Sequence, residues 1–192
     1  MTKSPPVTPN LGYVSVASLA PGATKTFSKS VRIPTTLAAG SYYLGAIADY
    51  KSTLTESDET NNDTASGAVT VYIPTPDLTA TAATVNPATV AQRGALALTG
   101  TISNVGTGKT GGASYAAFYL SDGVTDTFLK QLSVASTLAA GASVNLSTTY
   151  TLPAGFPAGT YTVKLVADYT DRLSEIDETN NGLSGNIVTV LP

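Results

Sequence analysis

Two short stretches of this 192-residue chain hold most of its acidic side chains, and their spacing suggests cation chemistry. Of the 13 Asp and Glu residues, five lie in 49–63 and five in 168–178. Carboxylate oxygens beside amide oxygens suit a hard cation such as calcium, which takes about 6 to 8 oxygen ligands. The clusters therefore predict a structural Ca²⁺ in each stretch. The expected donors are Asp49, Glu56 and Asp58 in the first, and Asp168, Glu175 and Asp177 in the second.

The same clusters also have a purely structural interpretation. Asp and Asn side chains accept hydrogen bonds from nearby backbone N–H groups and favour turns, and each cluster ends in Asn-Asn, at 61–62 and 180–181. The spacing does not match an EF-hand loop, which places its ligands at alternate positions around a central Gly. Both interpretations stay open. Calcium is the one candidate cofactor, and no cofactor is certain.

The residue types that are missing exclude most enzyme classes. With no His and no Cys, the chain has no Ser-His-Asp triad, no Cys nucleophile, no zinc or haem site of the usual kinds and no disulfide. Paired carboxylates could serve a glycosidase, but these lie in charge-rich turns, and the chain has no Trp. The net charge of −3 opposes nucleic-acid binding, which needs a basic face. We therefore predict that the chain is not an enzyme and binds no nucleic acid.

A glycine-rich stretch, Gly106-Thr107-Gly108-Lys109-Thr110, resembles the end of a phosphate-binding loop. That motif needs Gly five residues before the Gly-Lys pair, where this chain has Ser103, and a helix must follow it. The residues that follow, 114–120, instead have an aromatic strand pattern. A glycine-rich hairpin turn is the better explanation.

The acidic stretches are parts of a long internal repeat. Residues 42–62 and 161–181 have similar sequences, and the offset of 119 residues holds without a gap from Leu19 to Val71 against Leu138 to Val190. Upstream, residues 14–18 match 132–136 after one gapped step. A repeat this long is a whole domain. The second copy has a front half, 77–131, which has no counterpart in the first.

The elements that must position these loops are strands. Period-2 alternation bounded by turn residues predicts strands near 78–85, 95–103, 114–121, 127–134, 143–152, 160–168 and 186–191. Seven short strands indicate an all-β, two-sheet sandwich. Tyr161 and its counterpart Tyr42 each follow a Gly at the start of a strand, as in the tyrosine corner of immunoglobulin-like folds. Leu146, Val163, Leu165 and Val188 should be buried between the sheets.

A resemblance to a known family follows from the motifs of the second copy. They are Pro76-Asp77-Leu78, Asn104-Val105-Gly106, Leu138-Ala139-Ala140-Gly141 and, above all, Ala167-Asp168 followed by Glu175-Ile176-Asp177-Glu178-Thr179-Asn180-Asn181. The chain resembles the CARDB domain, the cell adhesion related domain found in bacteria, over 76–192, and over 12–73 in its second half. The resemblance implies a secreted or surface module arrayed in tandem, often appended to peptidases and adhesins, with no activity of its own.

Together these features predict tandem immunoglobulin-like β-sandwiches with a truncated first copy. We expect a partial domain at 1–73, a linker at 74–76 and a complete domain at 77–192. In the partial domain, the inner face of Phe27, Val31, Tyr42 and Leu44 would lack a covering sheet, and exposed edges invite self-association. The short, stiff linker disfavours folding of the first copy onto the second.

Two functions remain open. The first is a non-catalytic spacer or adhesion module of a larger bacterial or archaeal surface or secreted protein, with neighbouring CARDB-like domains as partners. The second is an accessory module of a secreted hydrolase that binds carbohydrate or protein. A smooth Thr/Ser/Ala surface would favour the first, and a planar patch of exposed Tyr the second. Low charge and the lack of Cys fit an extracellular or cell-surface location, and no window is apolar enough for a membrane span.

Overall fold

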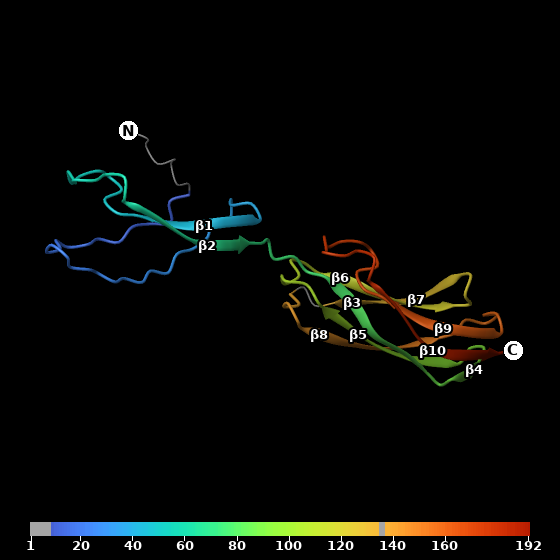
Figure 1. The fold of residues 1–192 in the computed structure, drawn as a ribbon. Coiled ribbons are helices and arrows are strands. Elements are labelled where there is room, and N and C mark those ends of the chain that lie inside the picture. Colours follow the sequence, from blue (N-terminus) through green and yellow to red (C-terminus); the bar gives the residue numbers. More distant parts are fainter. Residues whose placement is uncertain (1–8, 135–136) are drawn as a thin grey trace. The chain divides into compact units, whose positions relative to one another are not determined.

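The computed structural model describes residues 9–134 and 137–192, and these residues form an all-β protein of two units, Met1–Ile73 and Pro74–Pro192 (Figure 1). The described residues contain no helix that could cross a membrane. The strands are β1 (Gly40–Ile47), β2 (Asp63–Val71), β3 (Leu78–Asn86), β4 (Thr89–Ala91), β5 (Ala95–Asn104), β6 (Ser114–Ser121), β7 (Asp126–Val134), β8 (Ser143–Thr151), β9 (Gly159–Val166) and β10 (Gly182–Leu191).

Unit 2 is a two-sheet sandwich of the immunoglobulin-like kind. One sheet has the strand order β3-β5-β8, and the other has the order β4-β10-β9-β6-β7. Neighbouring strands are antiparallel except for β10 and β4, which are parallel. Each of the seven predicted strands is present. The additional strand, β4, has three residues and is too short for alternation to reveal it.

The core of unit 2 lies between the two sheets, where alternate side chains of each strand point inward. Front-half residues such as Leu98 and Phe118 meet back-half residues such as Val163 and Leu165, and all four are fully buried. The predicted burial of Leu146, Val163, Leu165 and Val188 is confirmed. Tyr161 forms the predicted corner, because its hydroxyl donates to the carbonyl oxygen of Pro157 at 3.0 Å.

In unit 1 the hairpin β1–β2 repeats the hairpin β9–β10. Gly40 pairs with Val71 as Gly159 pairs with Val190, and the register shifts at the same place in both hairpins, after Tyr43 and after Thr162. The corner is repeated too, since the Tyr42 hydroxyl donates to the Ala38 carbonyl oxygen at 2.9 Å. The sequence repeat is therefore a structural repeat at the level of the hairpin.

The two units differ where a strand needs a partner from the front half. Residues 24–32 are the counterpart of β8, yet they form no strand in unit 1. In unit 2, β8 lies at the edge of its sheet and pairs with β5 alone. A strand without a ladder partner leaves its backbone groups unpaired. Because the described residues of unit 1, from 9 onward, include no counterpart of β5, residues 24–32 stay outside a sheet.

Candidate functional site

The six predicted calcium ligands lie in two loops of the same local structure, one after β1 and the other after β9. In unit 2, Asp168 Oδ2 accepts a hydrogen bond from the N–H of Leu173 at 2.7 Å, and Asp177 Oδ1 accepts one from the N–H of Thr179 at 2.8 Å. The equivalent bonds in unit 1 join Asp49 to Leu54 and Asp58 to Thr60. The N–H of Leu54 lowers the pKa of Asp49, and the hydroxyls of Thr60 and Thr179 lower the pKa values of Asp58 and Asp177.

In unit 2 the acidic loop also holds the start of the domain. The N–H of Leu78 donates to Glu175 Oε1 at 2.8 Å, and the Asn180 amide donates to Asp77 Oδ1 at 2.9 Å. The N–H of Ile176 donates to the carbonyl oxygen of Pro76 at 3.0 Å. We call this contact between residues 175–180 and 76–78 the latch. It joins segments about 100 residues apart in the chain, so the Glu-x-x-Glu-x-Asn-Asn string has a structural task in unit 2.

Glu175 has the most perturbed environment in the latch. Burial raises its pKa to about 7, against the opposing hydrogen bonds from Leu78 and from the Asn181 amide, and the charges of Glu178 and Asp168 raise it further. A raised carboxyl pKa is typical of a general acid. Here, however, both carboxylate oxygens accept hydrogen bonds from within the unit. The raised pKa therefore follows from a structural contact.

Several of the oxygens predicted to bind calcium already accept hydrogen bonds from the protein. Glu175 Oε1 and Oε2, Asp168 Oδ2 and Asp177 Oδ1 all accept protein hydrogen bonds. Three buried oxygens in the same loop lack a hydrogen-bond partner within the described residues: Asp168 Oδ1, Asn180 Oδ1 and Asn181 Oδ1. Across residues 9–134 and 137–192, no three acidic side chains group closely enough to hold a metal ion. Calcium binding stays a prediction.

The glycine-rich stretch is a turn, as the sequence favoured. Asn104 is fully buried beneath it and donates to the carbonyl oxygens of Gly108 and Leu138. The N–H groups of Thr107 and Gly108 both donate to the carbonyl oxygen of Thr75, at 3.0 and 2.9 Å. A phosphate-binding loop needs free N–H groups. These are occupied by the segment that enters unit 2.

The outer face of the five-stranded sheet carries a cluster of aromatic rings, which we call the aromatic face. Tyr119 of β6 meets Phe128 of β7 edge to face at 5.7 Å, and Phe128 meets Tyr169 at 6.1 Å. Arg172 lies over the ring of Tyr115 at 5.5 Å. Burial, together with the nearby Tyr169 and Asp126, raises the pKa of Tyr119. The rings are in contact but not coplanar, whereas the neighbouring Phe118 of β6 is fully buried in the core.

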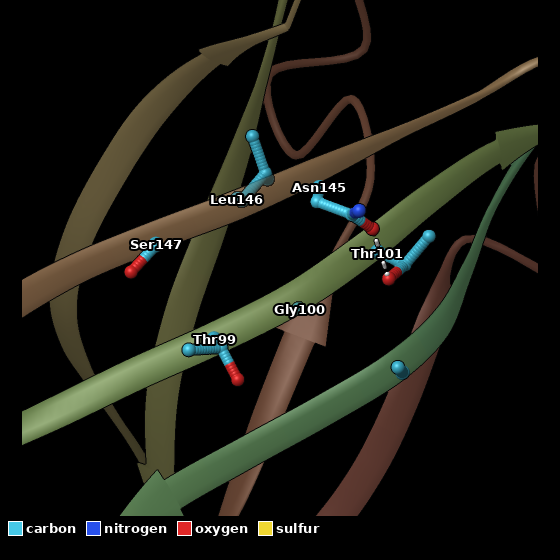
Figure 2. Close-up of a pocket in the computed structure, with 7 residues that line it drawn as sticks. Thr99, Gly100, Thr101, Asn145, Leu146 and Ser147 are labelled. Carbon is cyan, nitrogen blue, oxygen red and sulfur yellow. Dashed lines mark hydrogen bonds between the residues drawn. The ribbon is translucent and has the colours of Figure 1, made fainter.

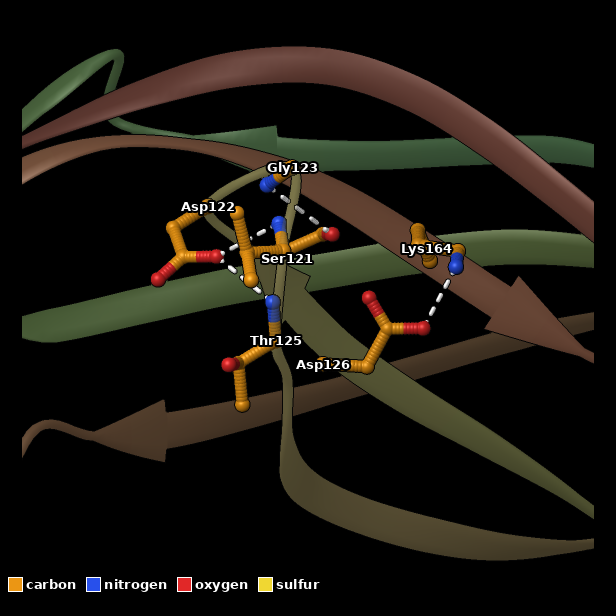
Figure 3. Close-up of polar contacts among 7 residues, drawn as sticks. Ser121, Asp122, Gly123, Thr125, Asp126 and Lys164 are labelled. Atoms are coloured by element: carbon orange, nitrogen blue, oxygen red, sulfur yellow. Dashed lines mark hydrogen bonds and ion pairs between the residues drawn. The ribbon is translucent and has the colours of Figure 1, made fainter.

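Figure 3 shows polar contacts at the β6–β7 turn and between this turn and β9. Lys164 of β9 forms an ion pair with Asp126 at the start of β7. Asp122 Oδ1 accepts hydrogen bonds from the N–H groups of Thr125 and Val124 at 2.7 and 2.8 Å, and these bonds lower its pKa. Asp122 is thus a turn residue, while Lys164 and Asp126 add paired charges beside the rings.

The outer face of the three-stranded sheet is different. It has a shallow depression lined by small and short side chains from β3, β5 and β8, among them Thr99, Thr101, Asn145 and Ser147 (Figure 2). The Thr101 hydroxyl donates to Asn145 Oδ1 at 2.9 Å, and the hydroxyls of Thr84 and Thr99 are hydrogen-bonded to each other. No residue lining the depression is titratable. This face thus carries a series of hydrogen-bonded hydroxyl and amide side chains.

Sequence reasoning missed two parts of this arrangement. It treated Asp77 only as part of a motif, although Asp77 is buried and bonded to Asn180. It also did not place Phe128 or Tyr169 beside Tyr119. One feature of the sequence did indicate the latch. The complete copy contains both Pro-Asp-Leu and Asn-Asn, whereas the partial copy contains Asn-Asn alone.

The CARDB family profile matches residues 7–66 and 75–185. Among solved structures, the chain is similar to the CARDB domain of a Pyrococcus furiosus protein in complex with di-metal ions, with 20% identity over 62% of this chain and 97% of that one (TM-score 0.47). It is also similar to a domain of a provisionally named cell surface protein from Methanosarcina acetivorans, with 24% identity over 61% and 93% (TM-score 0.43). A β-glucosidase from Erythrobacter marinus shares 13% identity over 60% of this chain but 16% of the enzyme (TM-score 0.44). No curated protein matches the chain.

Proposed function

Because the chain belongs to the CARDB family, we propose that it is a non-catalytic, immunoglobulin-like module of a larger bacterial or archaeal surface or secreted protein. Its task there is to space neighbouring domains of the same kind or to present them for adhesion. The extracellular location is part of this proposal. It is supported by the low content of charged residues and by a core that needs no disulfide.

The observation that carries the spacer role is the path of the chain through unit 2. The latch holds Leu78 beside the loop that leads into β10, so the chain enters unit 2 where β10 begins. β10 then runs for ten residues and ends at Leu191 beside β4. At about 3.3 Å per residue, the entering and leaving ends lie about 30 Å apart. Because the chain enters at one end of the module and leaves at the other, each module adds its full length to a tandem array.

Small-angle scattering tests the spacer role. Chains that carry one or two further copies of residues 74–192 after Pro192 should show a maximum dimension that grows by at least about 30 Å per copy. An appended copy with Phe118→Asp, which disrupts the core, controls for the effect of added mass without a folded unit. A maximum dimension that stays nearly constant as folded copies are added would remove the spacer role.

The aromatic face favours a second candidate function, the binding of carbohydrate or protein. Phe128 lies between Tyr119 and Tyr169 in the aromatic face, and 47% of its surface is exposed. Aromatic rings with polar groups at their rim are typical of recognition surfaces. The test is binding of the full chain to an array of cell-surface polysaccharides. Phe128→Ala should abolish binding, whereas Ile187→Ala, which removes an exposed apolar side chain from the same sheet, should not. Binding unaffected by Phe128→Ala would exclude this face.

Calcium remains a proposal for the loop of unit 2. The three unpartnered oxygens support it, because carbonyl and carboxylate oxygens are calcium's preferred ligands. A bound ion raises apparent stability by about 2.7 kcal/mol at a concentration 100 times Kd. We expect the melting temperature of unit 2 to rise in millimolar calcium relative to EDTA, and Asp168→Asn to remove the rise. Identical melting curves would end the proposal.

A further inference from the structure

In the described part of unit 1, several strand edges have no neighbouring strand. The corresponding edges in unit 2 each pair with a neighbouring strand. β1 and β2 pair only with each other within the described residues. Their counterparts have second neighbours, because β9 also pairs with β6 and β10 also pairs with β4. The β8 counterpart, residues 24–32, lacks its β5. All three missing neighbours correspond to one continuous stretch, β4 to β6.

The same comparison shows which side chains are uncovered. Several residues of unit 1 that match the core of unit 2 are exposed, as three matched pairs show: Phe27 is 54% exposed and Leu146 6%, Leu44 is 48% exposed and Val163 0%, and Val69 is 43% exposed and Val188 0%. In unit 2 these core positions are covered by front-half side chains such as Leu98 and Phe118. The uncovered side chains of unit 1 therefore form the inner face of a sandwich that lacks its other half.

We propose that unit 1 is an acceptor half-domain, completed by a polypeptide segment with the strand order and apolar pattern of residues 77–131. This occupant would add a strand to β1 in the manner of β6, a short parallel strand to β2 in the manner of β4, and a partner to residues 24–32 in the manner of β5. Strand addition of this kind combines main-chain hydrogen bonds with pockets for alternate side chains. It would turn residues 24–32 into a strand.

The occupant has to come from outside these 192 residues. Each chain holds two back halves, 12–73 and 132–192, but a single front half, 77–131. That front half is already committed to the core of unit 2. Exchange of front halves between copies would uncover one back half for each one that it covers. Copies of this chain therefore cannot complete one another.

One residue shows that the occupant differs from the front half of unit 2. Where β10 crosses β3, a Cβ on Gly185 would lie 1.9 Å from the carbonyl oxygen of Ala83. The counterpart of Gly185 in unit 1 is Ser66, whose hydroxyl accepts from the N–H of Leu44 at 3.1 Å. An occupant must therefore leave more room at this point than β3 does. A donor copied from unit 2 should fit better after Ser66→Gly.

The test supplies the missing half. In an extended chain, a copy of residues 76–131 is joined directly to Val14, which reproduces the order of the second repeat, and Ser66→Gly is introduced. Hydrogen exchange of residues 24–32 and of β1 should then slow by at least about 100-fold, approaching the rates of β8 and β9. The extended chain with Ser66 unchanged should show a smaller gain. Ser66→Gly without the extension should show none.

A matched control carries Leu98→Asp and Phe118→Asp in the added copy only, which removes its apolar face but keeps its length. It should leave unit 1 as unprotected as in the 192-residue chain without the extension. If the intact extension also leaves residues 24–32 unprotected while unit 2 stays folded, the proposal is wrong. If the extended chain is insoluble, the donor is co-expressed as a separate tagged polypeptide. Co-purification with the full chain carrying Ser66→Gly that is lost on Leu44→Asp supports the proposal, and no co-purification, or co-purification insensitive to Leu44→Asp, overturns it.

Discussion

The hairpins β1–β2 and β9–β10 have nearly the same structure but different surroundings. They share their register, their register shift, their corner tyrosine and the short-range hydrogen bonds within the loop that joins their strands. Only β9–β10 lies in a five-stranded sheet and faces a second one. The difference shows that the hairpin is determined by short-range contacts, whereas the core depends on the front half. A two-stranded hairpin alone is marginally stable in water.

The two acidic loops also differ in how far the matched glutamates are buried. Glu56 and Glu175 both accept a hydrogen bond from the Asn six residues later, at 2.7 and 3.0 Å. Glu56 is exposed, whereas Glu175 is buried against the first strand of its own domain. Burial disfavours the charged form of a carboxyl group. The raised pKa of Glu175 thus follows first from its burial in the completed domain.

The largest expected difference between the two hairpins is in their protection. In the full chain, the amides of β1 and β2 should exchange at least about 100-fold faster than those of β9 and β10, because an uncovered hairpin opens locally at low cost. Light scattering should show the full chain associating through the free edges of unit 1, and residues 74–192 remaining monomeric. Equal protection of both hairpins in a monomeric chain would contradict the comparison.

The second-largest difference should be in the cost of shortening a side chain at matched positions of the two hairpins. Val163→Ala removes two methyl groups from a fully buried site and should lower the free energy of unfolding of unit 2 by about 1–3 kcal/mol. Leu44→Ala, at the equivalent and exposed position, should cost less than about 0.5 kcal/mol. Urea unfolding measures both. Equal costs would mean that the face of unit 1 is covered in solution.

Burial of Glu175 should make the stability of unit 2 depend on pH. The folded-state pKa of Glu175, about 7, lies above the ordinary value of 4.5. Between these values the folded state binds more protons than the unfolded state, so stability falls as the pH rises from 4.5 to 7. Glu175→Gln should remove about 1–3 kcal/mol of this fall, as measured by urea unfolding in EDTA at pH 4.5 and pH 8. An unchanged profile in Glu175→Gln would refute the assignment.

The corner tyrosines should give the smallest difference. Tyr161→Phe removes the hydroxyl bond to Pro157 and should cost about 1 kcal/mol. The ring itself should stay in place, because it packs edge to face against Phe156 at 5.3 Å. Tyr42→Phe removes the same bond in unit 1 and should leave the thermal unfolding of unit 2 unchanged. A loss in unit 2 from Tyr42→Phe would show that the two units unfold together.

Much of unit 2 could be predicted because alternation and turn residues report a local preference. The miss at the start of β10 has a local reason. The register shift between Ser184 and Ile187 interrupts the alternation, so the predicted strand began at 186 rather than at Gly182. The latch could not be predicted in the same way. The hydrogen bond from Leu78 to Glu175 spans 97 residues, and no spacing rule connects two such positions.

The sequence by itself determined the hairpins, the corners and the acidic loops, which are built from bonds between residues that adjacent strands or a few positions bring together. The bonds of Thr60 with Asp58 and of Thr179 with Asp177 span two residues and form in either setting. Only the tertiary structure decided whether the β8 pattern becomes a strand and whether Glu175 is buried. The physical reason is that a ladder needs a second strand and burial needs a covering layer. In unit 2 the front half supplies both, and residues 24–32 of unit 1, with a similar pattern, lack them.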